Sequence, residues 1–181
     1  MTKTPVTYKE TLQGILEIHE IEGIIMDHLI LVQKFVLRNY KKIAINQETA
    51  QLLHKILAST LFEEAGTYRK HDVELGPYQP PHYFEVREQM KNWENDYAQR
   101  ARYAKKTKQK VELCAWLIHR FLWIHPFFDY NGRISRLLGE LCLLQSNLPI
   151  ISFRSTKRGD FVKAVKEATN TGDLSLLIQL I

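Results

Sequence analysis

The stretch from Val111 to Ile124 is apolar on nearly every side, and it limits the folds that this chain can adopt. At helical spacing one face carries Val111, Cys114, Ala115, Ile118, Phe121 and Leu122, and the other carries Leu113, Trp116, Leu117 and Trp123. A helix that is apolar all round is a buried helix. Because the residue before a proline disfavours helical backbone, this helix is predicted to end at Ile124-His125-Pro126.

Hydrophobic residues at helical spacing predict further helices on both sides of this segment. Gly23 follows an apolar stripe and is expected to stop a first short helix, since glycine often ends helices. Asn46 is a good N-cap for a later helix, because its side chain can accept a hydrogen bond from the first turn. The predicted helices cover residues 12–19, 25–42, 46–62, a segment after Pro81 that includes 86–97, and 133–145, 161–168 and 174–180.

One segment breaks the helical pattern. Residues 65–81 include two glycines and three prolines, and Thr67–Leu75 roughly alternates between polar and apolar residues. Alternation bounded by turn residues is typical of strands, so a small β-hairpin, or flap, is predicted here as the only strand pair. A two-stranded hairpin is marginal in water and must lean on the helices. The predicted fold class is therefore all-α, a helical bundle with a small β-hairpin flap.

The bulk composition is that of one globular domain. At 181 residues the chain is long enough to bury a core of its own. It begins without a signal-peptide pattern, and its uncharged apolar runs all fall short of the roughly 18 residues that a membrane span needs. A cytoplasmic location without a membrane partner is expected, although secretion without a cleaved signal would leave the same pattern. Cys114 and Cys142 are expected to be buried, reduced thiols.

A formal net charge of +5 suggests affinity for anions. Basic residues cluster between Arg100 and Lys110, where the pattern favours a solvated helix end and loop. Basic clusters need a readable motif to indicate nucleic-acid binding, so a nucleic-acid partner is disfavoured. A basic helical nucleic-acid binder is kept as a minor alternative.

The segment from His125 to Arg136 carries residue types that suit a reaction at phosphate. Asn131-Gly132 opens a predicted helix, where the first backbone N–H groups have no partner within the helix and the helix dipole attracts anions. Arg133 and Arg136 lie one turn apart and can converge on one anion. This helix N-terminus is therefore a predicted site for phosphate or carboxylate.

Asp129 and His125 precede that site. A carboxylate beside phosphate oxygens can hold Mg²⁺, and histidine has the pKa range of a general base at neutral pH. Each residue also has a plainer interpretation: His125 as a structural residue, Asp129 as an ordinary turn residue, and Arg136 as the ion-pair partner of Glu140. In this order, base, metal carboxylate and anion site describe phosphoryl or nucleotidyl transfer.

The sequence His-Pro-Phe-Phe-Asp-Tyr-Asn-Gly-Arg-Ile-Ser-Arg at 125–136 resembles the signature of Fic-domain proteins, His-x-Phe-x-(Asp/Glu)-Gly-Asn-Gly-Arg-x-x-Arg. Residues 65–69 are similar to the Gly-x-Tyr-Arg element before the Fic flap, and residues 78–81 are similar to the stretch that closes it. Residues 123–127 and 161–172 also fit. The resemblance implies one Fic domain over 1–181, with 8–23 as an N-terminal inhibitory helix and 24–181 as the core.

The resemblance implies a protein adenylyltransferase, which transfers AMP from ATP to a Ser, Thr or Tyr hydroxyl of a target protein. By position, His125 would deprotonate that hydroxyl, and Asp129 would bind the Mg²⁺ that bridges phosphates. The phosphates would be held by Asn131, Gly132 and Arg133, and the γ-phosphate by Arg136. The flap residues Lys70, His71, Asp72, Val73, Glu74 and Leu75 would dock the target by strand addition. The implied partners are ATP and a target protein, and a homo-oligomer is left open.

Two positions modify this expectation. Tyr130 stands where the family has glycine, which reaches backbone angles closed to tyrosine and leaves room beside the phosphates. Glu22-Gly23 matches part of the inhibitory element (Ser/Thr)-x-x-x-Glu-(Gly/Asn), with Ile18 in place of the hydroxyl residue. The resemblance implies that Glu22 pairs with Arg136 and restrains the enzyme; the plainer interpretation is an exposed glutamate near a helix end.

Three alternatives remain open at this point. The first is a Fic enzyme that removes AMP from its target, a reaction that the same glutamate supports in some relatives. The second is a Fic enzyme that uses another nucleotide. The third is a catalytically weak Fic domain that binds a nucleotide or a partner protein.

Overall fold

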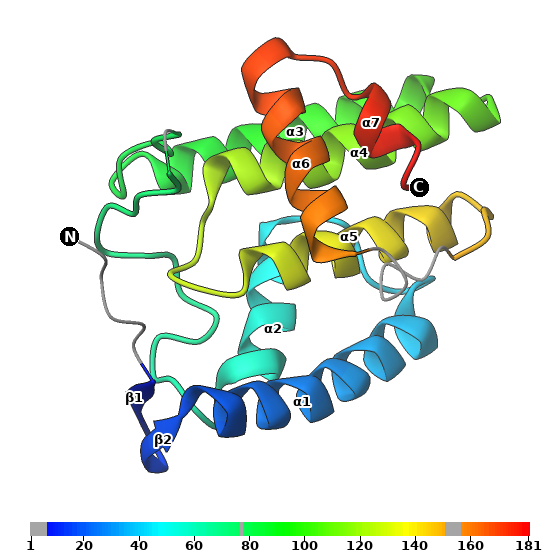
Figure 1. Cartoon of the computed structure of the whole chain (residues 1–181). Coiled ribbons are helices and arrows are strands. Elements are labelled where there is room, and N and C mark those ends of the chain that lie inside the picture. The colour runs from blue at the N-terminus through cyan, green and yellow to red at the C-terminus, as the bar shows by residue number, and fades with distance from the viewer. Residues whose placement is uncertain (1–6, 77, 151–156) are drawn as a thin grey trace.

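The computed structural model describes residues 7–76, 78–150 and 157–181, and it is mostly helical (Figure 1). The strands β1 (Tyr8–Thr11) and β2 (Gly14–Glu17) come first. They are followed by the helices α1 (Ile18–Asn39), α2 (Gln47–Ala58), α3 (Val86–Tyr103), α4 (Thr107–Ile124), α5 (Asn131–Gln145), α6 (Arg158–Thr171) and α7 (Ser175–Ile178). The predicted class, all-α with one small β-hairpin, is confirmed.

Helix α4 is the central element of the fold. Its buried residues are Leu113, Cys114, Ala115, Leu117, Ile118, Phe121, Leu122 and Ile124. It packs most extensively on α5 and then on α3, and α6 and α7 also contact it. Helices α1 and α2 pack on each other and on α5. In Figure 1, α5 (yellow) accordingly lies between the α3–α4 pair and α1.

The end of α4 turns the chain sharply into the motif loop. His125 is the C-cap, with φ 52° and ψ 60°, and its N–H donates to the Phe121 carbonyl at 3.0 Å. This left-handed backbone costs a non-glycine residue about 1–2 kcal/mol. Ile124 and Phe127 on either side are both fully buried, and their packing holds the turn in place. The predicted end of α4 is confirmed.

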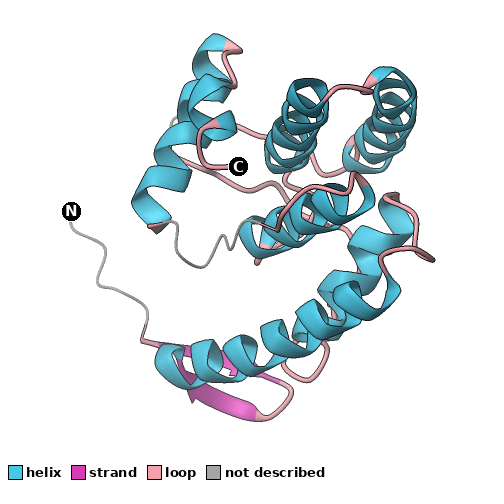
Figure 2. Cartoon of the chain, turned by 90° about the vertical axis from the view of Figure 1, so that its right-hand side faces the viewer, coloured by secondary structure: helices cyan, strands magenta, loops and turns pink. Residues whose placement is uncertain are grey.

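The β-hairpin lies at the N-terminal side of the chain, where the sequence predicted a helix over 12–19. Tyr8 pairs with Glu17 and Thr11 with Gly14 in an antiparallel register, and Gly14 takes a φ of +100° that suits the tight turn. The Leu12 N–H donates to the Leu61 carbonyl at 2.9 Å, and this hydrogen bond attaches the turn to the segment that follows α2. Figure 2 shows the hairpin beside the first turn of α1. Pairing between β1 and β2 stabilises this segment as a hairpin more than its weak helical pattern of apolar residues would stabilise a helix.

The predicted stop at Gly23 is also wrong, because α1 continues through it. The helix begins after Glu17, whose side chain and that of Glu20 form a reciprocal capping box. Ile21 and Ile25 on either side of Gly23 are buried in the core, and their packing outweighs the low helix propensity of glycine. Residues 8–23 are thus a hairpin followed by the start of a long helix, and the inhibitory role of this segment stays a prediction.

The segment predicted as a β-hairpin flap is an irregular loop in its described residues. A single bridge joins Leu75 and Tyr78, with backbone hydrogen bonds of 3.2 and 3.3 Å. The two ends of the loop are joined by side-chain hydrogen bonds and not by a ladder of backbone hydrogen bonds. Asp72 accepts from the Tyr83 N–H at 2.8 Å and contacts His82 Nδ1 at 2.9 Å. Polar side chains that bond the backbone locally compete with strand pairing, which explains the error.

The remaining helices agree with the sequence pattern. Asn46 caps α2 by accepting from the Thr49 N–H at 2.9 Å, as predicted, although α2 ends at Ala58 and not near Phe62. Cys114 and Cys142 are both buried and free. Within the described ranges, none of the helices combines the length and apolarity that a membrane span requires.

Candidate active site

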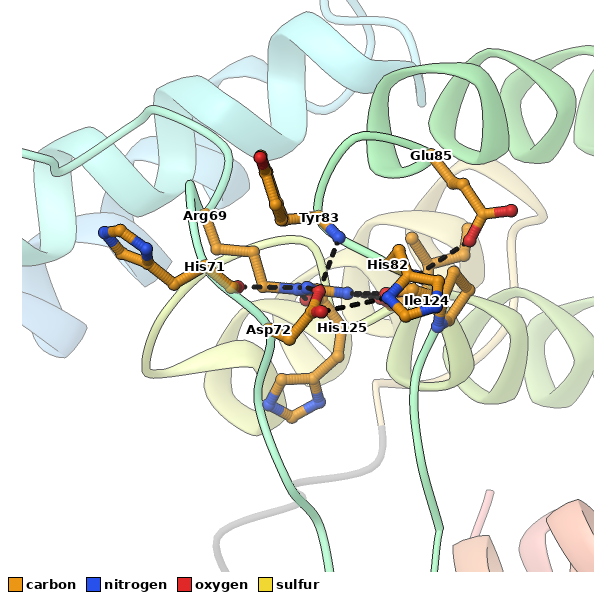
Figure 3. Close-up of polar contacts among 9 residues, drawn as sticks. Arg69, His71, Asp72, His82, Tyr83, Glu85, Ile124 and His125 are labelled. Atoms are coloured by element: carbon orange, nitrogen blue, oxygen red, sulfur yellow. Dashed lines mark hydrogen bonds and ion pairs between the residues drawn. The ribbon is translucent and has the colours of Figure 1, made fainter.

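The side chain of Arg69, which lies at the start of the flap loop, holds the loop between α4 and α5 (Figure 3). Its Nε donates to the His125 carbonyl at 2.9 Å, and its backbone N–H donates to the Pro126 carbonyl at 2.9 Å. The guanidinium also donates to the carbonyls of His71, at 3.1 Å, and of Pro81. Arg69 is only 5% exposed, and its charge is balanced by these carbonyl oxygens and by the Asp72 carboxylate, whose Oδ1 lies 3.5 Å from Arg69 Nη1. It fixes His125 relative to both ends of the flap loop.

The His125 ring is set up to accept a proton. Its Nδ1 is buried and has no hydrogen-bond partner among the described residues. Burial lowers the pKa of His125 to about 4; the Leu122 backbone opposes this, nearby Arg69 adds to it, and the Asp129 charge opposes it. The imidazole is therefore neutral at physiological pH.

Two backbone N–H groups at the start of α5 have no hydrogen-bond partner among the described residues. Arg133 and Ile134 both donate to the Tyr130 carbonyl, at 2.9 and 3.1 Å. The preceding N–H groups, those of Asn131 and Gly132, make no hydrogen bond to any described residue. Unpaired N–H groups at a helix N-terminus, together with the helix dipole, favour a bound phosphate or carboxylate.

The Asn131 side chain has a different task from the one predicted for it. It is 1% exposed, its Oδ1 accepts from the Phe127 N–H at 3.0 Å, and its Nδ2 donates to the Phe127 carbonyl at 2.7 Å. These paired bonds hold the motif loop against the first turn of α5. What Asn131 offers an anion is mainly its backbone N–H.

Tyr130 keeps the backbone geometry that glycine favours. Its φ of 58° and ψ of 9° lie in the left-handed region, and the residue is 8% exposed. The ring centroid lies 6.1 Å from that of Phe62 and 6.4 Å from that of His54, and the Arg133 guanidinium lies 5.2 Å above it. The phenol is thus packed toward α2 and the segment after it. The backbone turn that presents the α5 N–H groups is preserved.

Replacing Tyr130 with glycine is expected to lower stability. The ring's packing against Phe62 and His54 would be lost, at about 3–5 kcal/mol for a large aromatic side chain. Relief of left-handed backbone strain returns only about 1–2 kcal/mol. The melting temperature should fall by roughly 5–10 °C. Tyr130→Phe is the control, because the hydroxyl makes no hydrogen bond to a described residue, and it should melt with the native protein. A glycine variant as stable as the native protein would contradict this packing account.

The Glu22 carboxylate accepts a hydrogen bond from Arg133 and not from Arg136, so the predicted partner is wrong. Arg133 lies in the first turn of α5, close to α1. Arg136 is occupied elsewhere: its Nε donates to the Gly132 carbonyl at 2.9 Å, and its guanidinium lies 5.2 Å from the Phe161 ring. The side chain of Arg133 is 22% exposed and that of Glu22 is 46% exposed, so the pair lies at the rim of the site.

Positive charge is concentrated around the second motif arginine. Burial lowers the pKa of Arg136, repulsion from Arg133 and Arg158 adds to the lowering, and Glu140 opposes it. Positive charge at this end of α5 favours a bound anion.

The Asp129 carboxylate already faces a cation from the N-terminal hairpin. Lys9 Nζ lies 3.4 Å from Asp129 Oδ2, and the same ammonium group lies 4.4 Å above the Phe62 ring. The other carboxylate oxygen, Oδ1, accepts from the Tyr130 N–H at 2.7 Å. The Asp129 side chain is 52% exposed, so it is accessible to an ion from solution.

A sequence model of the Fic/DOC family matches residues 44–143, which is more than half of the 181 residues. The chain belongs to the Fic/DOC family. The residues that carry the Fic motif are therefore those whose geometry is described above. The matched range begins just before α2 and ends within α5, so it includes the flap loop.

Named relatives support this membership. A protein adenylyltransferase Fic from Nematostella vectensis is 28% identical over 183 residues, covering 100% of this chain and 42% of the relative. A Fido domain-containing protein from Dictyostelium discoideum is 32% identical over 123 residues, covering 62% of this chain and 82% of the relative. The chain spans less than half the length of the Nematostella adenylyltransferase.

Solved Fic structures share the fold. The crystal structure of BepC, a VirB-translocated effector protein from Bartonella tribocorum with bound AMPPNP, superposes with a TM-score of 0.79 at 18% identity, covering 99% of this chain and 92% of that chain. An N-terminal Fic domain from Bartonella quintana with bound ADP gives a TM-score of 0.76 at 15% identity, covering 99% and 91%. The predicted Fic-type helical bundle is confirmed.

A pocket of about 350 Å³ lies beside the Fic motif, between the N-terminal hairpin and the start of the flap loop. Its lining includes Lys9, His54, Phe62, Lys70, Asp129 and Tyr130. A larger open groove, of about 790 Å³, lies among α3, α4 and the segment after α6, and it contains no motif residue. The smaller pocket is the one adjacent to the predicted chemistry.

The flap residues predicted to dock a target line the approach to this pocket only in part. Lys70 and His71 line it, and the other four, Asp72, Val73, Glu74 and Leu75, lie further along the loop. Backbone groups from Lys70 to Glu74 make no backbone–backbone hydrogen bond within the described chain. The segment is not itself a β-strand, its His71 carbonyl accepts from Arg69, and its role in docking a target stays a prediction.

Three residues that contact the motif loop were not predicted as site residues from the sequence: Arg69, Lys9 and His54. A buried arginine in a loop leaves no periodic pattern. Lys9 and Asp129 lie 120 residues apart, so no local pattern could have paired them.

Proposed function

We propose that this chain is a protein adenylyltransferase, which transfers AMP from ATP to a Ser, Thr or Tyr hydroxyl of a target protein. One observation carries the proposal: a neutral histidine and a pair of free backbone N–H groups, at Asn131 and Gly132, stand at opposite ends of one short loop. The name of the Nematostella relative supports this reaction, and the bound AMPPNP and ADP of the Bartonella structures support ATP as the donor.

The proposed reaction uses each motif residue once. The target hydroxyl oxygen bonds to the α-phosphorus as the bond from that phosphorus to the pyrophosphate oxygen breaks, and His125 takes the hydroxyl proton. The N–H groups of Asn131 and Gly132, with Arg133 and Arg136, hold the phosphates in place. Fixed donors aimed at developing negative charge are the main source of acceleration in such transfers.

The site suits a divalent cation that arrives with the nucleotide. Among the described residues there is no group of three or more metal-binding side chains, and Asp129 is a single accessible carboxylate that already faces the Lys9 ammonium. Magnesium typically takes one or two carboxylates and completes its shell with phosphate oxygens and water. Asp129 would hold Mg²⁺ in this way, and the ion would offset the negative charge of the phosphates.

Labelled nucleotide distinguishes this reaction from its alternatives. The Glu22→Ala form would be incubated with Mg²⁺, cell lysate and ATP labelled either at the α- or at the γ-phosphate. Label that depends on the added protein, above that of lysate alone, should appear from α-labelled ATP and not from γ-labelled ATP. Added-protein-dependent transfer from the γ position would show a kinase, and label only from another nucleotide would show another donor. Loss of AMP from a premodified target would favour the reverse activity.

A general base with a lowered pKa also predicts how the rate of AMP transfer varies with pH. Because burial lowers the pKa of His125 to about 4, below the ordinary 6.5, the base stays unprotonated in all but acidic solution. The kcat/KM of the Glu22→Ala form should be flat from about pH 8 down to about pH 5 and then fall. The unfolded state binds the proton more readily between pH 6.5 and 4, so stability also decreases over this window as pH falls. Circular dichroism at each pH separates the two effects. A midpoint near pH 6.5 would mean that the ring is solvated.

Lys9 should compete with the metal ion. Removing its ammonium group from Asp129 with Lys9→Met should lower the Mg²⁺ concentration for half-maximal labelling about two- to fivefold, the range of an exposed ion pair. The measurement is the initial rate as a function of Mg²⁺, with ATP saturating. Lys34→Met, an exposed lysine on α1, is the control with the same loss of charge. Superimposable Mg²⁺ curves for Lys9→Met and Lys34→Met would contradict the assignment.

We further propose that Glu22 restrains the enzyme by occupying Arg133. The carboxylate bonds a guanidinium that the phosphates need, so a nucleotide must compete with it. The proposal differs from the sequence-based one in the arginine involved.

A further inference from the structure

Helix α1 lies at the edge of the molecule and leaves large apolar side chains exposed (Figures 1 and 2). Its buried residues are Ile21, Ile25, Val32 and Val36. On another side of the same helix, Met26, Ile30 and Leu37 are 46%, 39% and 49% exposed. Single exposed apolar residues are ordinary, whereas several in a line on one helix indicate a surface that another molecule covers.

The exposed residues follow the spacing of paired helices. Gly23, Ile30 and Leu37 succeed one another at intervals of seven residues, and Met26 follows Gly23 by three, so the four form one seam along α1. The surface beside Gly23 is open, since a Cβ built there would meet no atom within 4 Å. A seam that repeats every seven residues is the pattern by which two helices pack together.

Charged residues on one flank of the seam indicate which helix fits it. Also at intervals of seven, this flank carries Glu20, Asp27, Lys34 and, just past the end of the helix, Lys41. All four are exposed, and none of them makes an ion pair with another residue in the described part of the chain. The row is therefore acidic along the first half of α1 and basic along the second.

A second copy of the same helix, running in the opposite direction, complements this row of charges. Flank positions of one kind face each other across an antiparallel helix pair, so Asp27 meets Lys34 of the second copy, and Lys34 meets its Asp27. Glu20 and Lys41 meet in the same way, because both pairs are centred on the same point of the helix. In a parallel pair, by contrast, the two acidic halves would lie side by side.

We propose that the exposed side of α1 is a self-association surface, on which two copies of this chain pair through antiparallel α1 helices. Met26 then packs against Leu37 of the second copy, and Ile30 lies next to the two-fold axis, so both copies use the same residues. One helix from each copy makes an interface below the standard size, and the dimer is expected to dissociate in the micromolar range. The inference concerns assembly and is independent of AMP transfer.

Analytical ultracentrifugation of the whole chain tests the surface. Between about 1 µM and about 1 mM the native chain should change from monomer to dimer. Ile30→Glu should raise the dissociation constant more than about tenfold, because it places two carboxylates beside the axis. Leu52→Glu is the control: it alters a leucine of α2 that is also exposed, and it should dimerise like the native chain. Circular dichroism would check that α1 stays helical.

Exchanging the charges tests the antiparallel orientation. Asp27→Lys and Lys34→Asp should each raise the dissociation constant about 5- to 20-fold, since each turns two attractive contacts into repulsive ones. The double variant Asp27→Lys/Lys34→Asp restores opposite charges across the pair and should bind within about twofold of the native chain. Seven residues separate the two positions on one helix, so they do not pair within one chain, and the recovery would report a contact between copies.

A native chain that stays monomeric up to about 1 mM would overturn the proposal. A dimer that Ile30→Glu leaves intact would place the contact elsewhere and overturn it as well. A double charge variant as weak as the single ones would contradict the antiparallel pairing. The assays of AMP transfer use the chain below the micromolar range, where it is a monomer, so Asp27→Ala and Lys34→Met remain neutral controls there.

Discussion

His125→Ala in the Glu22→Ala form is expected to reduce the rate of AMP transfer by about 10²–10⁴-fold, the usual contribution of a positioned general base. The substitution removes the imidazole and leaves the N–H groups of Asn131 and Gly132 in place. Nucleotide affinity should therefore change little, so the loss falls on kcat and not on KM for ATP. Initial rates with α-labelled ATP, together with calorimetric titration of AMPPNP, measure both quantities.

His19→Ala is the matched control, because that histidine is exposed in the first turn of α1 and its side chain pairs with Glu17. It should transfer AMP at the parental rate. His125→Ala labelling at the parental rate would exclude His125 as the base. A loss of nucleotide binding equal to the loss of rate would make it a structural residue of the anion site.

Glu22→Ala is expected to raise AMP transfer by about 10- to 100-fold over the native chain, the scale of one charge-assisted hydrogen bond returned to the phosphates. The carboxylate that now accepts from Arg133 would be gone, and alanine next to Gly23 keeps the helix propensity of α1. The gain should appear mainly as tighter productive binding of ATP. Arg133→Ala in the same form should cancel the gain, since the released guanidinium is what produces it.

Asp27→Ala removes the same charge from the same helix at an exposed position away from Arg133, and it should leave the rate of the native chain unchanged. Equal rates for Glu22→Ala, Asp27→Ala and the native chain would remove the restraint and leave Glu22 as a surface residue. An Arg136→Ala variant that cancels the gain while Arg133→Ala does not would restore the pairing predicted from sequence.

The helices of the core could be predicted from sequence because they depend on the local spacing of hydrophobic residues. The run from Val111 to Ile124 predicted a buried helix, and the following proline predicted its end, as found. The hairpin was placed wrongly because strand formation depends on a partner. Thr67–Leu75 alternates but is held by side chains such as Asp72, whereas Tyr8–Thr11 gains a neighbour after the turn at Gly14.

The sequence predicted which consecutive residues form the candidate site, but not the contacts that distant residues make with them. Its motif residues are consecutive, so their order alone indicated a base, a carboxylate and an anion site. The contacts that set their geometry come from distant segments: Arg69 on the His125 carbonyl, Lys9 on Asp129, and Glu22 on Arg133. Which of two arginines one turn apart meets Glu22 depends on how α1 packs on α5, and spacing cannot decide it.

The position of the Tyr130 side chain also could not be predicted from the motif. From sequence, tyrosine in place of glycine raised the question of whether its ring obstructs the phosphates. In the fold the backbone takes the left-handed angles of glycine, and the ring packs beside Phe62 and His54. The position of the ring is set by aromatic residues that are distant in sequence from the motif, so the motif alone could not predict it.

The most direct measurement is a crystal structure of the Glu22→Ala form with AMPPNP and Mg²⁺. The phosphates should accept from the N–H groups of Asn131 and Gly132, with the α-phosphate facing His125 Nε2, the ion on Asp129, and the Tyr130 ring still against Phe62. A nucleotide bound elsewhere, or a Tyr130 ring turned into the space above the α5 N-terminus, would contradict the proposal that this loop is an adenylyl-transfer site.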